Sequence, residues 1–526
     1  MQRRRPTSRH HVIVGAGSAG CVLANRLTEN PSVSVTLIEA GPDYPSTQAP
    51  RAVQDISPMT VLTSSDEASV RWDDLHAHRT NTQEPMMLWR GRGSGGSSSI
   101  NGMLAVRPEP DDLDAWEAAG CTGWGWRDML PWFNAIESDL EFGGEAWHGD
   151  QGRIPVWRPG LDGWGAVELA ALHAIRDLGD PWCPDHNRPG STGVGPYAAN
   201  IDTSVSPPVR VSANSAYLDE ARRRPNLTII GEALVDQVIV EGDRAVGVTY
   251  LREGVTGVVE TAAGGQVILC AGSPFTPTIL LRSGIGPEGS VADIVGVGRQ
   301  ISDHPGLGIQ ILTPEADAVP PSNGRHINCF GRWSSGLAGG GVNDLAWLAG
   351  AHPRPRPDGN FLSQIQVALW QPFSCGEITL VNTDPRQLPR IDVGMLDDER
   401  DRIRMRAGFR RLVEVMTHPA VSALPGRRSY GRRSVPIDDV GRFLDLSDDE
   451  VDDLLATSVY DTQHIVGGCV MGDSDNAVVD PHCQVRGVED LLVVDGSILP
   501  SCPRANTHFT VLAIAERMAA RLGRKP

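Results

Sequence analysis

The sequence predicts an α/β protein in which a Rossmann-like domain is combined with a discontinuous α+β domain that contains an antiparallel sheet. Near the N-terminus, a strand, a glycine-rich loop and a helix follow one another, and a second strand then ends in an acidic residue. Helical and strand patterns continue in the remaining sequence without an internal repeat. The chain has 526 residues, a length that favours about two or three domains.

The glycine-rich loop is "GAGSAG" at 15–20, between the β-branched run "VIV" and an apolar helix. Its three glycines allow a tight turn, an approach of backbone to a pyrophosphate and close packing of helix on strand. Glu39, about twenty residues beyond the loop, is placed to accept from ribose hydroxyls. A purely structural glycine turn is the alternative, but the ordered context favours a bound ADP moiety. The residues predicted to hold it are Gly15, Gly17, Ser18, Ala19, Gly20, Glu39 and Ala40.

A second glycine-rich stretch, "LWRGRGSGGSSSINGM", occupies 88–103. Small residues allow backbone to lie against a flat ring or a second phosphate. A flexible Gly/Ser linker has the same composition, so the stretch by itself leaves both interpretations open.

Composition excludes several classes of protein. Lys and Arg total 47 and Asp and Glu total 65, so the formal net charge of −18 argues against a nucleic-acid partner. The nine cysteines include no CxxC pair, and no histidine or carboxylate spacing is typical of a metal site. There is no apolar run typical of a membrane span or a signal peptide. We therefore expect a cytoplasmic protein without a metal or a membrane partner.

Three segments together resemble the signatures of the glucose-methanol-choline (GMC) oxidoreductases, a family of FAD-dependent enzymes that act on alcohols. They are the stretch at 88–103, "AGSPFTPTILLRSGIGP" at 271–287, and "HIVGGCVMG" at 464–472 with the C-terminal block that follows. The similarity extends from near residue 12 to near residue 520. It implies FAD, an alcohol substrate, and O₂ or another electron acceptor.

The resemblance also implies positions for the flavin. Residues matching those that line the cofactor are Ser97, Asn101, Gly102, Leu104, Val235, Asp495, Gly496 and Thr507. Ile100 stands where some members of the family carry the histidine that bonds covalently to FAD, so we expect noncovalent binding.

His464 and His508 match the two active-site positions of the family, of which the second is His or Asn. Alcohol oxidation requires removal of the hydroxyl proton as hydride leaves the carbon, and histidine titrates near working pH. We predict that His464 is the base and that His508 holds the alcohol oxygen beside it. The alternative for His508 is a helix cap, because it lies at the start of the apolar helix "FTVLAIAERMA". His304 in "DHPG" is interpreted as a turn residue.

The predicted FAD-binding domain comprises 1–110, 201–302 and 457–526, and the substrate-binding domain comprises 111–200 and 303–456. In the latter, "WGAVELAALHAIRDLG" is a predicted helix, and "SQIQVALWQ" and "GEITLVN" are predicted strands of its sheet. Trp347, Trp370 and Phe373 are candidate pocket walls, with packing in the core as the favoured alternative for each of them. A lyase that retains FAD without net redox chemistry and a non-catalytic flavoprotein are the alternative functions.

Overall fold

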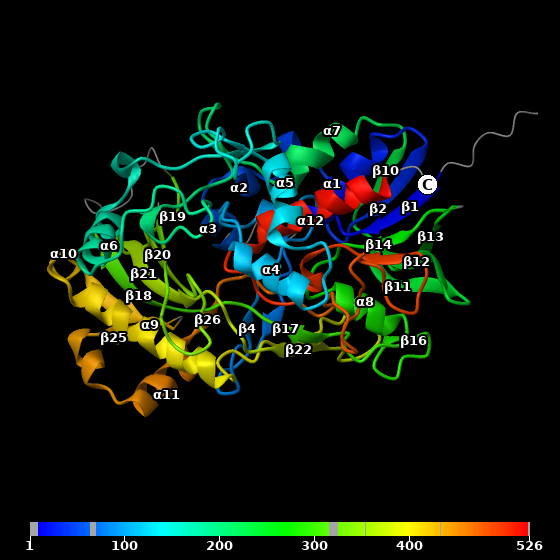
Figure 1. Cartoon of the computed structure of the whole chain (residues 1–526). Helices are drawn as coiled ribbons and strands as arrows, with labels where there is room; N and C mark the ends of the chain where they lie inside the picture. The colour runs from blue at the N-terminus through cyan, green and yellow to red at the C-terminus, as the bar shows by residue number, and fades with distance from the viewer. Residues whose placement is uncertain are drawn as a thin grey trace, which may run out of the picture.

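The computed structural model describes residues 9–63, 70–262, 264–314, 324–352, 354–431 and 433–523. Two sheets organise them. In Figure 1 the strands of a parallel sheet lie on the right and those of a larger antiparallel sheet on the left. Each sheet contributes to a separate large hydrophobic core. The predicted combination of a Rossmann-like unit with an α+β unit is confirmed.

The parallel sheet has the strand order β10-β2-β1-β14-β27. Val12 pairs with Thr36 on one side and with Val267 on the other, so strands distant in sequence form one layer. Burial on both faces explains the β-branched runs of the central strands. The five strands are β1 (Arg9–Val14), β2 (Val33–Ile38), β10 (Leu227–Ile230), β14 (Val267–Leu269) and β27 (Leu491–Val493).

Helix α1 (Ser18–Thr28) begins directly after the glycine-rich loop and packs on β1 and β2. A Cβ atom on Gly20 would lie 1.9 Å from the carbonyl oxygen of Gly15. Only glycine therefore allows the helix to come this close to the end of β1, as the spacing of the loop predicts.

The antiparallel sheet has the order β25-β24-β18-β21-β20-β19-β7, and β26 also pairs with β18. The predicted strand "SQIQVALWQ" at 363–371 overlaps β21, which ends two residues earlier, whereas the first four residues of "GEITLVN" form β22 in a separate sheet with β17 and β23. The strands are β7 (Gly193–Pro196), β18 (Pro305–Thr313), β19 (Ile327–Trp333), β20 (Leu345–Ala351), β21 (Phe361–Leu369), β24 (Arg427–Tyr430), β25 (Val435–Ile437) and β26 (Tyr460–Asp461).

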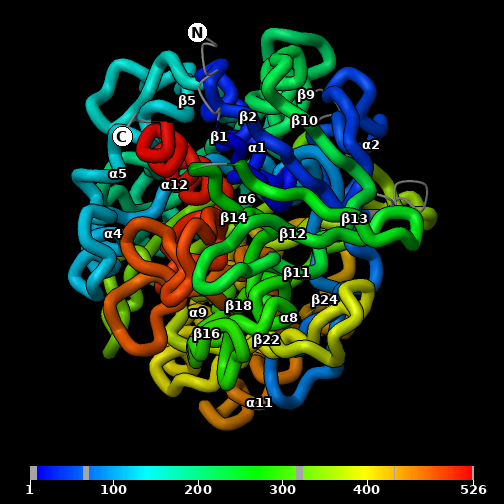
Figure 2. The backbone as a smooth tube through the Cα atoms, turned by 90° about the vertical axis from the view of Figure 1, so that its right-hand side faces the viewer, coloured from blue at the N-terminus to red at the C-terminus, as the bar shows by residue number. Residues whose placement is uncertain are grey.

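Two segments differ from the predicted domain boundaries in how they pack. Helices α4 (Pro110–Ala118) and α5 (Trp126–Ile136), assigned to the substrate domain, bury Trp116 and Phe133 in the core of the parallel sheet. Helix α5 also packs against helix α12 (Thr507–Leu522), which contacts α1 as well; Figure 2 shows α12 in red and α5 in cyan. The short hairpin at 76–87, assigned to the FAD domain, buries Ala77 in the other core. The amphipathic face of α5 explains why it covers α12.

The remaining helices and strands cover the two sheets or connect them. Helices α6 and α9 pack on the antiparallel sheet, and α6 coincides with the helix predicted from "WGAVELAALHAIRDLG". The other helices are α2 (Arg51–Gln54), α3 (Pro58–Thr63), α6 (Ala166–Asp177), α7 (Asp219–Ala221), α8 (Thr276–Arg282), α9 (Glu399–Thr417), α10 (Pro419–Ser422) and α11 (Asp448–Ser458). The other strands are β3 (His76–Ala77), β4 (Met86–Met87), β5 (Glu137–Asp139), β6 (Ile154–Val156), β8 (Ile201–Asp202), β9 (Val209–Arg210), β11 (Leu234–Glu241), β12 (Arg244–Arg252), β13 (Val255–Glu260), β15 (Ile285–Gly286), β16 (Ala292–Asp293), β17 (Arg299–Ile301), β22 (Gly376–Thr379) and β23 (Arg390–Asp392). Among the described residues, no helix has both the length and the apolar character needed to cross a membrane.

Candidate active site

A cavity of about 450 Å³ extends from the C-terminal end of the parallel sheet to the antiparallel sheet. This is where ligands bind in open α/β sheets. The candidate walls Trp347 and Trp370 do not line this cavity and are buried in hydrophobic cores instead. Apart from Gly20, whose role is in helix packing, every residue predicted to bind the cofactor or to act in catalysis lines the cavity. They are Gly15, Gly17, Ser18, Ala19, Glu39, Ala40, Ser97, Asn101, Gly102, Leu104, Val235, His464, Asp495, Gly496, Thr507 and His508.

Glu39 lies at the end of the cavity lined by the glycine-rich loop at 15–20, which is called the nucleotide end below. Its carboxylate accepts hydrogen bonds from the backbone N–H groups of Ala16 (2.7 Å), Gly41 (2.9 Å) and Gly93 (2.9 Å). Burial raises the pKa of this carboxyl, and the three N–H donors act in the opposite direction. Glu39 therefore connects the glycine-rich loop, the end of β2 and the second glycine-rich stretch.

The second glycine-rich stretch is an ordered loop that packs on the first. The backbone N–H of Gly95 donates to the carbonyl of Ala16 at 2.8 Å. Gly96 has a φ of +51°, and a Cβ atom there would lie 2.8 Å from Cα of Gly17. The two loops thus approach at a distance that excludes side chains, so the interpretation as a flexible linker is wrong.

His508 lies at this nucleotide end, in the first turn of α12. Its Nδ1 is 3.0 Å from Oγ of Ser18, and its Nε2 is buried without a hydrogen-bond partner among the described residues. Burial, with a smaller effect from the charge of Arg210, lowers the pKa of His508 to about 4. A neutral imidazole with a free nitrogen at the glycine-rich loop suits contact with a bound cofactor.

His464 has a different partner from the one predicted. Its Nε2 is 2.9 Å from Nδ2 of Asn506, and the Asn506 Oδ1 accepts from the hydroxyl of Tyr197 at 2.7 Å. Asn506 occupies the N-cap position of α12, yet its side chain makes no capping hydrogen bond. A residue type favoured for capping is therefore used to hold the histidine.

The predicted pairing of His464 with His508 is replaced by a pairing with Asn506. Successive residues of a helix are rotated by about 100°, so side chains two positions apart point in nearly opposite directions. Asn506 accordingly faces His464 while His508 faces Ser18. The cap alternative for His508 is also wrong, because Asn506 is the N-cap residue and His508 follows it inside the helix.

His304 belongs to the same group of polar side chains and was not recognised from the sequence. Its Nδ1 lies 3.0 Å from Nδ1 of His464, and its Nε2 lies 2.9 Å from the carbonyl oxygen of Pro503. Thr462 contacts Nδ1 of His464 at 2.8 Å. Trp370, a candidate pocket wall, instead stacks on the His304 ring with a centroid distance of 4.3 Å. The "DHPG" motif was the available signal, but nothing in it indicates a partner 160 residues away.

Electrostatic surroundings keep His464 neutral. Burial lowers the pKa of its imidazole well below 6.5, and His304 and the half-buried Arg90 act in the same direction. A neutral histidine is the form that can accept a proton.

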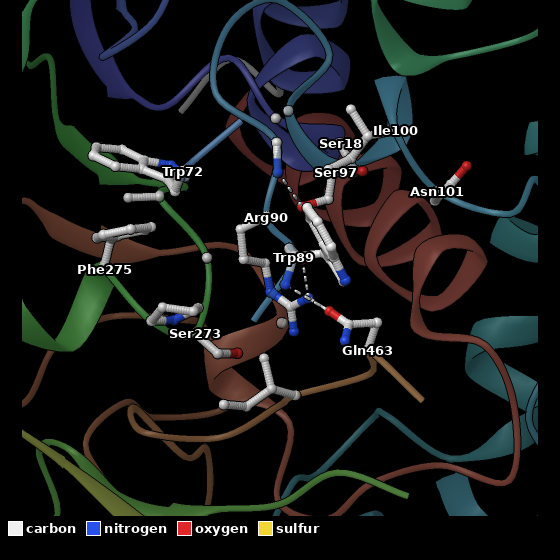
Figure 3. Close-up of a pocket in the computed structure, with 18 of the residues that line it drawn as sticks. Ser18, Trp72, Trp89, Arg90, Ser97, Ile100, Asn101, Ser273, Phe275 and Gln463 are labelled. Atoms are coloured by element: carbon white, nitrogen blue, oxygen red, sulfur yellow. Dashed lines mark hydrogen bonds between the residues drawn. The ribbon is translucent and has the colours of Figure 1, made fainter. Parts of the chain in front are cut away.

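Aromatic side chains form one wall of the cavity, as Figure 3 shows for Trp72 and Phe275. Their ring centroids are 4.4 Å apart. Gln463 accepts from the backbone N–H of Trp89 at 2.9 Å and from the Arg90 guanidinium at 3.3 Å. This connects the first signature stretch to the loop that carries His464.

Two groups of described side chains have the composition of metal ligands. In the first, the direct hydrogen bond between His304 and His464 occupies the nitrogens that would face an ion. In the second, Glu137, Asp139 and His148 are joined by two arginines: Arg107 lies 2.5 Å from Glu137 and Arg158 lies 3.0 Å from Asp139. Direct pairing with cations already neutralises these carboxylates, which disfavours a metal ion.

The cavity fits a flavin dinucleotide. Glycine backbone and the N-terminus of α1 line its nucleotide end, where a partial positive charge favours phosphate. Buried polar atoms without partners, the Oγ of Ser273 and the Nε2 of His508, belong to residues of its lining. The carboxylate of Asp495 is fixed by Gly272 N–H at 2.8 Å and the Thr276 hydroxyl at 2.6 Å. Such preorganised groups are typical of a cofactor site.

Known proteins of similar sequence and structure support this interpretation. Models of the N- and C-terminal parts of GMC oxidoreductases match residues 9–306 and 372–515. The 5-(hydroxymethyl)furfural oxidase of Methylovorus sp. (strain MP688) is 34% identical over 97% of both chains. The oxygen-dependent choline dehydrogenase of Ectopseudomonas mendocina is 34% identical over 97% of this chain and 93% of its own. The crystal structure of pyridoxine 4-oxidase from Mesorbium loti has a TM-score of 0.84 and 29% identity, covering 97% of this chain and 98% of the other.

The matches span nearly the whole chain, and they agree with the paired glycine-rich loops and the polar group around His464 in one cavity. The predicted family and the predicted cofactor are both confirmed: the chain belongs to the GMC oxidoreductases, and its cofactor is FAD.

Proposed function

We propose that this oxidoreductase oxidises a primary or secondary alcohol to an aldehyde or ketone, with His464 as the base and Asn506 as its hydrogen-bonding partner. The observation that carries the proposal is the distance of 2.9 Å between Nε2 of His464 and Nδ2 of Asn506, in the cavity that the cofactor loops also line. The similarity to enzymes named for hydroxymethylfurfural and choline, both alcohols, supports it.

The two side chains supply complementary functions. The bound alcohol displaces the Asn506 N–H from Nε2 of His464. The neutral imidazole then takes the hydroxyl proton, and the amide N–H of Asn506 donates to the oxygen on which negative charge develops. Proton removal increases the tendency of the carbinol carbon to release hydride. FAD, when bound, supplies the acceptor for that hydride at its N5.

His508 is assigned to cofactor binding rather than to proton transfer. Its Nδ1 is held by Ser18, and its unpaired Nε2 is available to the cofactor. The position of Ile100 in the lining favours FAD held without a covalent bond, because its side chain carries no nucleophile. Acid precipitation of the protein should then release all the flavin into the supernatant.

Reoxidation by O₂ or by another electron acceptor completes the proposed cycle. A lyase without net redox chemistry is the second candidate, because the same base could remove a proton without hydride transfer. The two differ in one observable, since only an oxidation reduces the flavin.

Anaerobic mixing of the holoenzyme with aryl, aliphatic, amino-alcohol and sugar substrates tests the proposal. We expect the flavin absorbance to bleach with at least one of them, and admission of air to show whether O₂ restores the colour. A flavin that stays oxidised with every alcohol, while the protein converts a cyanohydrin, would establish the lyase instead.

A further inference from the structure

Five groups on four segments of the chain form a continuous line of hydrogen bonds through the candidate base. The line runs from the Tyr197 hydroxyl to Asn506, His464 and His304, and ends at the carbonyl oxygen of Pro503. We propose that each group in this line donates its hydrogen bond to the next, from Tyr197 to Pro503. Tyr197 and His304 are then positioning residues that keep the lone pair of His464 on Nε2. The inference deepens the proposed function, because that lone pair is the one that accepts the alcohol proton.

The direction is set first at the His304 end. A carbonyl oxygen only accepts, so the contact of 2.9 Å with Pro503 requires a proton on Nε2 of His304. The Cys502 thiol also contacts this Nε2 at 3.2 Å, but its own proton has the carbonyl of His464 as an acceptor at 3.8 Å. Burial lowers the pKa of His304 to about 3, so the ring is neutral and its Nδ1 carries a lone pair.

His464 is the next group in the line of hydrogen bonds. Its Nδ1 lies 3.0 Å from the unprotonated Nδ1 of His304, a distance that requires a proton between the two nitrogens. His464 must provide it, and Thr462 at 2.8 Å is a second acceptor for the same N–H. In a neutral imidazole only one nitrogen is protonated, so Nε2 of His464 carries the lone pair.

The Asn506 end gives the same answer independently. Burial raises the pKa of the Tyr197 phenol, which therefore stays protonated and donates to Oδ1 of Asn506 at 2.7 Å. This fixes the amide with Nδ2 directed at Nε2 of His464. A flipped amide would place an oxygen against the lone pair of Nε2, which is repulsive.

The consequence is that His464 is held as a proton acceptor before substrate arrives. With the other tautomer, Nε2 would carry a proton and could not act as a base. In serine proteases, an incorrect histidine tautomer costs about 10⁴ in rate, and in metal sites loss of the outer-shell partner that fixes a ligating histidine costs about 10- to 100-fold in affinity or activity.

Two substitutions test the line from its two ends. His304→Phe retains a flat ring for stacking on Trp370 and removes the acceptor, whereas Tyr197→Phe removes one oxygen atom. We expect the limiting rate of anaerobic flavin reduction to fall about 10- to 100-fold in the first and about tenfold in the second, with a smaller change in apparent substrate affinity. His304→Asn, whose Oδ1 can accept in place of Nδ1, should recover part of the rate.

A matched control is His186→Phe. His186 is another buried, neutral histidine, and it packs edge-on against Phe330 outside the cavity lining. We expect its variant to reduce flavin at the parental rate. NMR of holoenzyme labelled with ¹⁵N-histidine gives a second measurement: the Nδ1–H of His464 should be observed in the parent and in His186→Phe, and in His304→Phe, where Thr462 remains as its acceptor, its proton signal should shift and exchange faster with water.

Parental reduction rates in both His304→Phe and Tyr197→Phe would overturn the inference, as would an Nδ1–H signal of His464 whose chemical shift and exchange rate are the same in His304→Phe as in the parent. If His304→Phe fails to bind FAD, the Tyr197→Phe rates still decide the question. If no alcohol reduces the parent enzyme, the proposed function fails instead, and the NMR comparison still tests the direction of the hydrogen bonds.

Discussion

The approach of Gly96 to Gly17 gives a quantitative prediction about cofactor binding. In Gly96→Ala the new Cβ would lie 2.8 Å from Cα of Gly17, closer than packed carbon atoms allow, and φ at this position is +51°. The atoms nearest to this Cβ are backbone atoms of Gly17, which cannot rotate away as a side chain could. Relief of the clash therefore requires one loop to move against the other. The two loops that line the nucleotide end of the cavity must therefore separate.

The expected cost has two parts. A left-handed backbone costs a residue with a side chain about 1–2 kcal/mol, and overpacking adds about 1–3 kcal/mol. Gly242 isolates the first part, because it has a φ of +65° with no atom within 4 Å of a built Cβ. We expect the free energy of unfolding to fall by about 1–2 kcal/mol in Gly242→Ala and by about 2–5 kcal/mol in Gly96→Ala.

FAD titration of the apoproteins is the decisive assay. Since 1.4 kcal/mol corresponds to a tenfold change, Gly96→Ala should bind FAD at least about tenfold more weakly than the parent. Gly242→Ala should bind FAD with parental affinity, because its turn lies between β11 and β12 and outside the cavity lining. Equal FAD affinity and equal stability in the two variants would contradict this prediction.

Two further predictions concern stability. Burial alone would lower the pKa of His148, but hydrogen bonds to Asp185 and Glu137 raise it to about 9. Its stabilising contribution is therefore complete below the unfolded value of about 6.5 and is lost as the pH rises through 9. Urea unfolding between pH 6 and 10 should show this loss in the parent and not in His148→Gln. Separately, Asp112→Asn should lower the free energy of unfolding by about 3–5 kcal/mol, because it leaves the buried Arg504, whose Nε is 2.8 Å from Asp112, without its carboxylate. A loss below about 1 kcal/mol in urea titrations would contradict the importance of that pair.

The nucleotide end of the cavity was largely predictable from the sequence. Strand, loop, helix and acidic residue are adjacent in the chain, so their order reports their geometry. Glu39 lines the cavity as predicted, and Gly20 has a packing role that the spacing implies. The contact between the two glycine-rich loops was not predicted, because composition does not distinguish an ordered loop from a flexible one.

The substrate end was less predictable because its geometry depends on contacts distant in sequence. Asn506 and His508 lie in one helical turn, and only the rotation of α12 decides which of them faces His464. His304 reaches the site because β26 pairs with β18, with Asp461 opposite Pro305. This pairing brings together segments about 155 positions apart, which periodicity within either segment cannot show.

Stopped-flow reduction of His464→Ala and His508→Ala by the best alcohol tests the central claim most directly. We expect that His464→Ala retains FAD and is reduced at least about a hundredfold more slowly, because it has lost a general base. We expect that His508→Ala mainly loses affinity for FAD, and that the fraction with bound FAD is reduced much faster than His464→Ala. Parental reduction in His464→Ala, or a loss of reduction rate confined to His508→Ala, would contradict the assignment of His464 as the base.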